Sequence, residues 1–237
     1  MVLKLLAAVA VEVAYAVFTR TWLSEHLGGA QLEVAISACR VATIIVYWSL
    51  FRELIESRPK VSSSLRHPLL VGGVALALAI PFLFQGWSPG GGLGTALVFA
   101  STSAIVGLRE ELVYRAVLLN LLQPRLGIVG SLLCSTAVFV LYHYGALPIT
   151  WLTITETTCM SLLLGLIYMR SGSLMLVAAI HALYDGIWFF GPFLANPPQD
   201  EWRPLFLLSA LALGALWYLT GAQPTVQADA AAPRRLT

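Results

Sequence analysis

The chain alternates long apolar stretches with short polar breaks. A helix needs about 20 mostly apolar residues to span a bilayer, and eight stretches meet this requirement. They are residues 3–20, 33–53, 68–87, 94–121, 127–146, 149–169, 173–193 and 203–220. Clusters of Gly, Pro and Ser separate them, as at Gly28-Gly29 and Ser171-Gly-Ser173. The pattern predicts an all-α fold, in which a polytopic membrane protein forms a bundle of about eight transmembrane helices.

The composition supports a lipid environment. Hydrophobic residues make up 58% of the chain and charged residues 11%, and the mean hydropathy is +0.81. A soluble domain has about 25% charged residues. The net charge of +2 comes without a block of Lys or Arg, so nucleic acid is not an expected partner. Cys39, Cys134 and Cys159 lie in apolar stretches without paired spacing, and we interpret them as inert small hydrophobes.

We expect a single transmembrane domain over residues 1–220. The remaining segment, 221–237, is rich in Ala and Pro and is predicted to be a disordered cytoplasmic tail. The N-terminus has a second interpretation, because Lys4, an apolar run and Ala14-Tyr-Ala16 are also typical of a signal peptide and its cleavage site. Glu12 within the apolar run argues against cleavage.

Charged and titratable residues interrupt several of the predicted helices. A charge near the centre of a bilayer costs at least ~2.5–3.5 kcal/mol on insertion scales, so such residues are few and usually functional. They are Glu12, Arg40, Arg109, Glu110, Glu111, Arg115, His143, Glu156, His181 and Asp185. Most of them fall in three stretches, 94–121, 127–146 and 173–193. Two of the four histidines of the protein are among them.

Helix geometry assigns these residues to different faces. Glu111 and Arg115 are four residues apart, with the acid first, which favours an ion pair on one face. Glu110 lies about 100° around the same helix and faces another neighbour. His181 and Asp185 also share a face. A carboxylate from one helix and imidazoles from two others can therefore converge in the core, where a carboxylate accepts a proton and imidazoles polarise a carbonyl oxygen.

A purely structural interpretation applies to some of these residues. A buried polar group in a membrane helix is often a helix–helix hydrogen bond, worth ~0.6 kcal/mol on average. We interpret Glu12, Arg40 and Glu156 in this way, and we expect Arg109 to extend toward an interface. A separate structural role for each member does not explain the set formed by Glu110, His143, His181 and Asp185. Each of these residues is costly to place in a membrane, and they lie on three helices, so we expect a shared function.

Three motifs follow one another within 76 residues: Glu110-Glu-Leu-Val-Tyr-Arg115, Phe139-Val-Leu-Tyr-His143 and His181-Ala-Leu-Tyr-Asp185. Their order, EExxxR, FxxxH and HxxxD on successive predicted helices, resembles the signature of the CPBP family of intramembrane glutamic endopeptidases. That family includes CAAX prenyl proteases and bacteriocin-processing, Abi-type enzymes. The resemblance covers roughly residues 94–193 and implies a transmembrane protease domain.

The resemblance also implies roles for the site residues. Glu110 would activate a water molecule as general base, and His143 would help to hold that water. His181 and Asp185 would stabilise the oxyanion or its surroundings. Glu111 and Arg115 are the expected supporting pair. The implied partners are a protein or peptide substrate at the membrane and the lipid bilayer, with no cofactor.

Asp185 has two possible roles within this scheme. As a charged acceptor it would take a hydrogen bond from an imidazole N–H of His181 and fix the tautomer of that ring. As a neutral acid it would itself donate to the oxyanion. We favour the first role.

Other functions remain open from the residues alone. Glu110, His143 and His181 could be ligands of a zinc ion in an intramembrane metalloprotease, although no HExxH motif is present. Buried Glu and His also relay protons in transporters, but no repeat-related halves are evident. A non-catalytic membrane immunity or binding protein is a further alternative, which the intact site residues disfavour. The sequence does not select among prenylated CAAX tails, peptide precursors and C-terminal sorting signals as substrates.

The distribution of Lys and Arg in short loops predicts the orientation in the membrane. With the N-terminus inside, nine of the fourteen basic residues lie in inside loops and termini, two lie outside, and three lie within helices. The inside nine are Lys4, Arg52, Arg58, Lys60, Arg66, Arg125, Arg170, Arg234 and Arg235, and the outside two are Arg20 and Arg203. We therefore expect a multi-pass protein of a bacterial- or archaeal-type inner (plasma) membrane, with both termini in the cytoplasm.

Reporter fusions test this topology. Fusions at Gly29, Lys60 and Asn196 should place only the Lys60 reporter in the cytoplasm, because one predicted span separates Lys60 from Gly29 and five separate it from Asn196. A cytoplasmic reporter at Asn196 would contradict the scheme.

Overall fold

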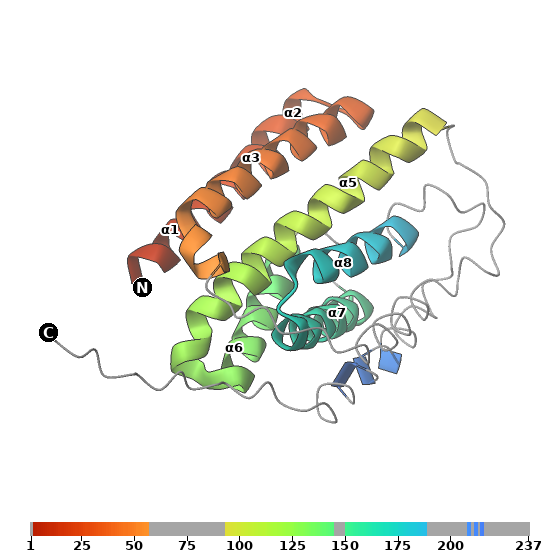
Figure 1. Ribbon diagram of the computed structural model, residues 1–237. Helices are drawn as coiled ribbons and strands as arrows, with labels where there is room; N and C mark the ends of the chain where they lie inside the picture. Colours follow the sequence, from red (N-terminus) through yellow and green to blue (C-terminus); the bar gives the residue numbers. More distant parts are fainter. Residues whose placement is uncertain are drawn as a thin grey trace, which may run out of the picture.

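The computed structural model describes residues 2–56, 93–144 and 150–188, and six further residues between 208 and 215. All the elements in these ranges are helices (Figure 1). The prediction of an all-α fold is confirmed to this extent. The predicted helix at 68–87, most of the predicted helix at 203–220 and the predicted tail at 221–237 lie outside the described residues.

The N-terminal part is a pair of long helices. α1 (Val2–Val17) continues through a π-helical stretch, η1 (Phe18–Leu23), into the short α2 (Ser24–His26), and α3 (Gly29–Glu56) follows. The hydroxyl of Tyr47 on α3 donates to the carbonyl oxygen of Ala8 at 2.9 Å. In Figure 1 these helices lie together on one side of the molecule, with α3 next to α5.

The middle of the chain is a long helical run with one sharp kink. It comprises α5 (Leu93–Glu111), the π-helical η2 (Leu112–Leu119) and α6 (Asn120–His143). Gly127 has a φ of 66° inside α6, a left-handed conformation that suits glycine, and Pro124 precedes it. The predicted break between 94–121 and 127–146 is therefore a kink, after which α6 packs against η2.

Two further helices complete the described fold. α7 (Trp151–Ser171) begins at Thr150, whose side-chain oxygen accepts from the Thr153 N–H at 3.1 Å. It ends at Gly172, which has a φ of 64° and donates its N–H to the carbonyl oxygen of Tyr168. α8 (Leu174–Trp188) follows directly.

The helices have the length and surface of membrane spans. Within the described residues, Gln31–Glu56, Ala96–His143 and Trp151–Ser171 are long and apolar enough to cross a membrane, and Leu174–Gly186 is a shorter apolar helix. Large apolar side chains such as Val129 and Leu141 are 68% and 69% exposed. In water, patches of such residues would favour aggregation. In a membrane they would contact lipid tails, which are equally apolar.

A close helix–helix contact positions the site. α5 and α8 lie side by side in Figure 1. A Cβ atom at Gly107 of α5 would lie 2.7 Å from the carbonyl oxygen of Ala178 and 2.9 Å from the nitrogen of Ala182, both on α8. Small residues at such contacts let two backbones approach closely. The approach brings the end of α5, with its two glutamates, next to the two titratable residues of α8.

Replacement of Gly107 by alanine should therefore destabilise the protein. The added methyl group meets backbone atoms of α8 and forces the helices apart, at a cost of about 1–3 kcal/mol. Gly94→Ala is the matched control, because a Cβ at Gly94 of the same helix meets nothing within 4 Å. Thermal unfolding in detergent should show a lower midpoint for Gly107→Ala than for Gly94→Ala. Equal midpoints would contradict the close contact.

Candidate active site

Glu110 lies in the last turn of α5 and is the centre of the site. The residue is only 7% exposed. Its Oε2 atom is 3.7 Å from Nε2 of His143 on α6 and 3.8 Å from Nε2 of His181 on α8. The structure thus brings together three of the predicted site residues from three helices. Both distances exceed a direct hydrogen bond, and Oε2 has no hydrogen-bond partner among the described residues.

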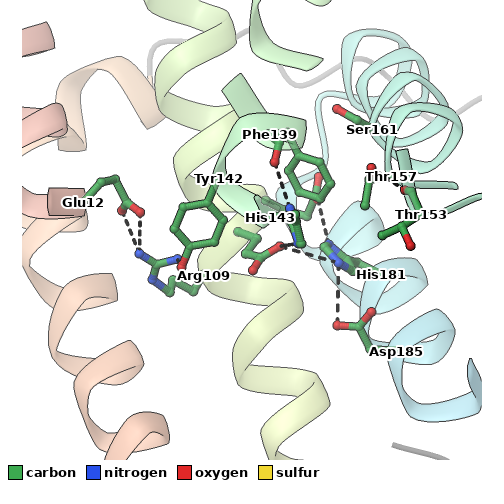
Figure 2. A network of polar contacts seen from close by, with 12 residues as sticks. Glu12, Arg109, Phe139, Tyr142, His143, Thr153, Thr157, Ser161, His181 and Asp185 are labelled. Carbon is green, nitrogen blue, oxygen red and sulfur yellow. Dashed lines mark hydrogen bonds and ion pairs between the residues drawn. The ribbon is translucent and has the colours of Figure 1, made fainter. Parts of the chain in front are cut away.

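The backbone of its own helix orients His143. Its Nδ1 atom lies 2.8 Å from the carbonyl oxygen of Phe139, one turn earlier (Figure 2). A carbonyl only accepts, so Nδ1 carries the proton and Nε2 presents a lone pair toward Glu110 when the ring is neutral. The ring of Phe139 is tilted against the imidazole at a centroid distance of 4.4 Å. The FxxxH spacing therefore supplies both an acceptor and a packing surface for His143.

Glu111 orients the second imidazole. Nδ1 of the buried His181 donates to Oε1 of Glu111 at 2.9 Å. The sequence analysis favoured Asp185 as the acceptor for this ring, and that role stays a prediction. The close approach of α5 and α8 places Glu111 beside Nδ1, whereas Oδ2 of Asp185 lies 3.7 Å from Nε2, beyond hydrogen-bond distance (Figure 2).

Asp185 nevertheless lies at the site. It is buried on the same face of α8 as His181, one turn further along, and its carboxylate is directed toward Nε2 of that ring (Figure 2). Nε2 of His181 therefore faces both Glu110 and Asp185. The part that Asp185 has in stabilising an oxyanion stays a prediction.

The expected ion pair between Glu111 and Arg115 is present. Nε of Arg115 lies 3.2 Å from Oε2 of Glu111, and both side chains are fully buried. The guanidinium also donates to the hydroxyls of Ser135 on α6 and Ser161 on α7, at 3.3 Å and 3.2 Å. Glu111 therefore has two partners, Arg115 and His181, of which the sequence analysis anticipated the first.

The π-helical stretch that contains Arg115 was not predicted. η2 begins directly after the glutamate pair, at Leu112, and nearly all of its residues are buried. Single π-helical turns inside α-helices often occur at functional sites. An apolar run such as LVYRAVLL fits an α-helix equally well by hydrophobic pattern, so the sequence holds no signal for it.

Other polar residues take structural positions. Glu156 on α7 accepts a hydrogen bond from the hydroxyl of Tyr184 on α8, as expected for a helix–helix contact. Arg40 lies 4.0 Å from Glu33 on its own helix instead of pairing with a neighbouring helix. Arg109 does not extend to an interface. It is 1% exposed and is paired with Glu12 of α1, which makes its burial tolerable.

The carboxylates in and next to the site differ in their cationic partners. Glu111 has Arg115 and Glu12 has Arg109. Among the described residues, no Lys or Arg lies within 4.0 Å of Glu110. The imidazoles of His143 and His181 do lie within that distance. Within the same residues, no group of three His, Cys, Asp or Glu side chains is arranged to hold a metal ion. Glu110 is thus a buried carboxylate that faces two imidazoles without a permanent cation beside it.

Comparison with known proteins identifies the segment that carries this site. Residues 92–187 match the family model described as Rce1-like, the type II CAAX prenyl endopeptidases. This segment is similar to the Rce1-like family. The match includes all three motifs and confirms the resemblance found in the sequence. No curated protein and no solved structure matches the chain.

The match to the Rce1-like family indicates the general class of the segment 92–187. The family is one of CAAX-type proteases, and the described part of the chain has helices that are able to cross a membrane. These two findings support a peptidase that acts on protein or peptide substrates at a membrane.

The Glu111→Gln variant should be markedly less stable than the wild type. Glutamine leaves Arg115 charged and buried without its partner, which typically costs about 3–5 kcal/mol. Chemical or thermal unfolding in detergent measures the loss. Glu56→Gln is the matched control, because Glu56 also pairs with an arginine four residues away, Arg52, but at the surface, where such pairs contribute ~0.3–0.5 kcal/mol. Similar stability of the two variants would contradict the structural importance of the buried pair.

Proposed function

We propose that this protein is an intramembrane endopeptidase of the glutamic type. In this mechanism a water molecule activated by Glu110 hydrolyses a peptide bond of a membrane-associated or C-terminally processed protein. The observation that carries the proposal is the position of Glu110: Oε2 is buried, faces the Nε2 atoms of His143 and His181 at 3.7 and 3.8 Å, and has no Arg or Lys beside it among the described residues. A carboxylate in this position can accept a proton.

The first step of the mechanism uses Glu110 and His143. The Nδ1 proton of His143 is held by the carbonyl oxygen of Phe139, so the Nε2 lone pair can accept one hydrogen of the nucleophilic water. Glu110 takes the other hydrogen as a proton while the water oxygen attacks the carbonyl carbon of the substrate. A positioned base of this kind contributes about 10²–10⁴-fold to the rate.

The second step uses His181. When this ring is protonated, its Nδ1–H donates to Glu111 and its Nε2–H is available to the oxyanion that forms on the substrate. The carboxylate of Glu111 stabilises the positive charge of the ring and fixes its orientation. Glu110 then delivers its proton to the leaving amine as the C–N bond breaks, which returns the carboxylate to its ionised form.

The matched family and the membrane setting support one substrate class. Members of the matched family are named for CAAX prenyl tails, so a prenylated C-terminal peptide is the first substrate to test. We further propose that the catalytic segment forms part of a bundle of about eight spans, with both termini in the cytoplasm, as the basic residues indicate.

Replacement of Glu110 by glutamine tests the proposal. Glu110→Gln should lower the turnover of an internally quenched prenylated CAAX peptide by about 10²–10⁴-fold, with unchanged expression and unfolding midpoint. Glutamine keeps the shape of the side chain but cannot accept the proton. Glu53→Gln is the control, because the side chain of Glu53 is 94% exposed. Proteomics of membrane and secreted fractions from cells with wild type or Glu110→Ala should reveal the natural substrate.

Two outcomes would overturn the assignment. An active Glu110→Gln together with a folded but inactive Glu111→Gln would reverse the roles of the two glutamates. Inhibition of the wild type by a chelator, with rescue by zinc, would favour the metalloprotease in which Glu110, His143 and His181 are ligands.

A further inference from the structure

The residues that immediately precede the base and the first histidine are bound to each other. Arg109 precedes Glu110 on α5, and Tyr142 precedes His143 on α6. Nη1 of Arg109 donates to the hydroxyl of Tyr142 at 3.2 Å, and the guanidinium also lies against the Tyr142 ring, 5.5 Å from its centroid. A displacement of either side chain is therefore transmitted to both members of the site.

α1 and α3 hold this junction from the other side. Nη2 of Arg109 donates to both carboxylate oxygens of Glu12, at 2.8 and 2.6 Å (Figure 2). Nε of Arg109 donates to the hydroxyl of Thr43 on α3 at 3.2 Å, and the guanidinium lies 3.9 Å from the ring centroid of Tyr15 on α1. All three nitrogens of the guanidinium are thus engaged. Among the described residues, Glu12 is the carboxylate within 4.0 Å that balances this buried charge.

A second arginine of the N-terminal segment binds the end of α6. Arg20, in η1, donates from Nη2 to the carbonyl oxygen of Tyr142 at 2.8 Å and from Nη1 to that of Tyr144 at 3.2 Å. Carbonyl groups at the C-terminus of a helix have no intrahelical partner, and a cation there also interacts favourably with the helix dipole. His143 lies between the two carbonyls that Arg20 binds.

We propose that the N-terminal segment α1–η1 is part of the active-site framework, and that Glu12 is a positioning residue for catalysis. Glu12 keeps Arg109 directed away from Glu110, and through Tyr142 it fixes the end of α6 that carries His143. Glu12 and Arg20 both lie outside residues 92–187, the segment that matches the protease family. The inference rests on the function proposed above.

The electrostatics of the junction explain why Glu12 matters for the reaction. Arg109 is adjacent to Glu110 in sequence, and its charge acts on that carboxylate. Removal of Glu12 leaves a buried guanidinium without its counter-ion, a strongly unfavourable state. The carboxylate next in the sequence is Glu110. If the guanidinium of Arg109 paired with it, that guanidinium would occupy the lone pairs with which Glu110 takes the proton from water. Glu12 therefore protects the base as well as stabilising the fold.

Kinetics of three variants test this role. Glu12→Gln should lower kcat by about 10–100-fold per folded enzyme, with KM within about twofold, since a displacement of about 1 Å at a site costs as much as 10²-fold. The double variant Glu12→Gln/Arg109→Gln should recover part of that loss, because it removes the unbalanced charge beside Glu110 although it also removes the bond to Tyr142. Glu56→Gln, the surface control, should behave as the wild type.

A measurement that does not need a substrate accompanies the kinetics. The protein has four histidines, so side-chain ¹⁵N spectra of histidine-labelled protein in detergent can be assigned with single His→Gln variants. The ring signals of His143 should shift in Glu12→Gln and in Arg20→Gln, and should stay in place in Glu56→Gln. These shifts are expected even if the wild type cleaves no test peptide, so failure of the proposed function is distinguishable from failure of this inference.

Two results would overturn the proposal. One is a folded Glu12→Gln enzyme that keeps the wild-type kcat and the wild-type His143 signals. The other is a double variant that is no more active than Glu12→Gln, which would exclude an uncompensated Arg109 as the cause of the loss.

Discussion

The interior of this helix bundle does not tolerate a charge without a partner, and the rest of the site depends on this constraint. Lipid and packed apolar side chains cannot replace the hydration of an ion, so each buried charge needs a counter-ion and hydrogen bonds from neighbouring helices. Arg115 meets this need with Glu111 and two serine hydroxyls. Arg109 meets it with Glu12, Thr43 and Tyr142. These contacts join α1, α3, α6 and α7 to the end of α5, so the polar contacts decide which helices lie beside the catalytic glutamate.

Three consecutive residues of α5 turn this constraint into a site. Successive side chains on a helix point about 100° apart, so Arg109, Glu110 and Glu111 point in three different directions. The first meets α1, the second meets the imidazoles of α6 and α8, and the third meets His181 and Arg115. The flanking pair is fully engaged, and this fixes the rotation of α5 about its axis. Glu110 is thereby presented to the histidines without a direct bond that would occupy its proton-accepting oxygen.

The sequence predicted much of this arrangement. The spacing of Glu111 and Arg115 predicted their ion pair. The three motifs on successive helices predicted that Glu110, His143 and His181 converge. It did not give the acceptor for His181, because the i, i+4 rule pairs this residue with Asp185, whereas the close approach of α5 and α8 at Gly107 places Glu111 there. The partner of Arg109 was missed for a similar reason. Glu12 lies 97 residues away in the chain, and no local spacing connects the two residues.

Pairing also separates the structural carboxylates from the catalytic one. The carboxylates of Glu12 and Glu111 are each paired with an arginine, and these pairs stabilise the fold. Glu110 instead faces two imidazoles and has no Lys or Arg within 4.0 Å among the described residues. Its burial is less compensated than that of Glu111, since the Oε2 atoms of both residues lack a hydrogen-bond partner among the described residues but only that of Glu111 lies beside an arginine. Because this cost is local, the ion pairs on either side must hold the helix in place, and for that reason we propose that the N-terminal helix α1 is part of the active-site framework.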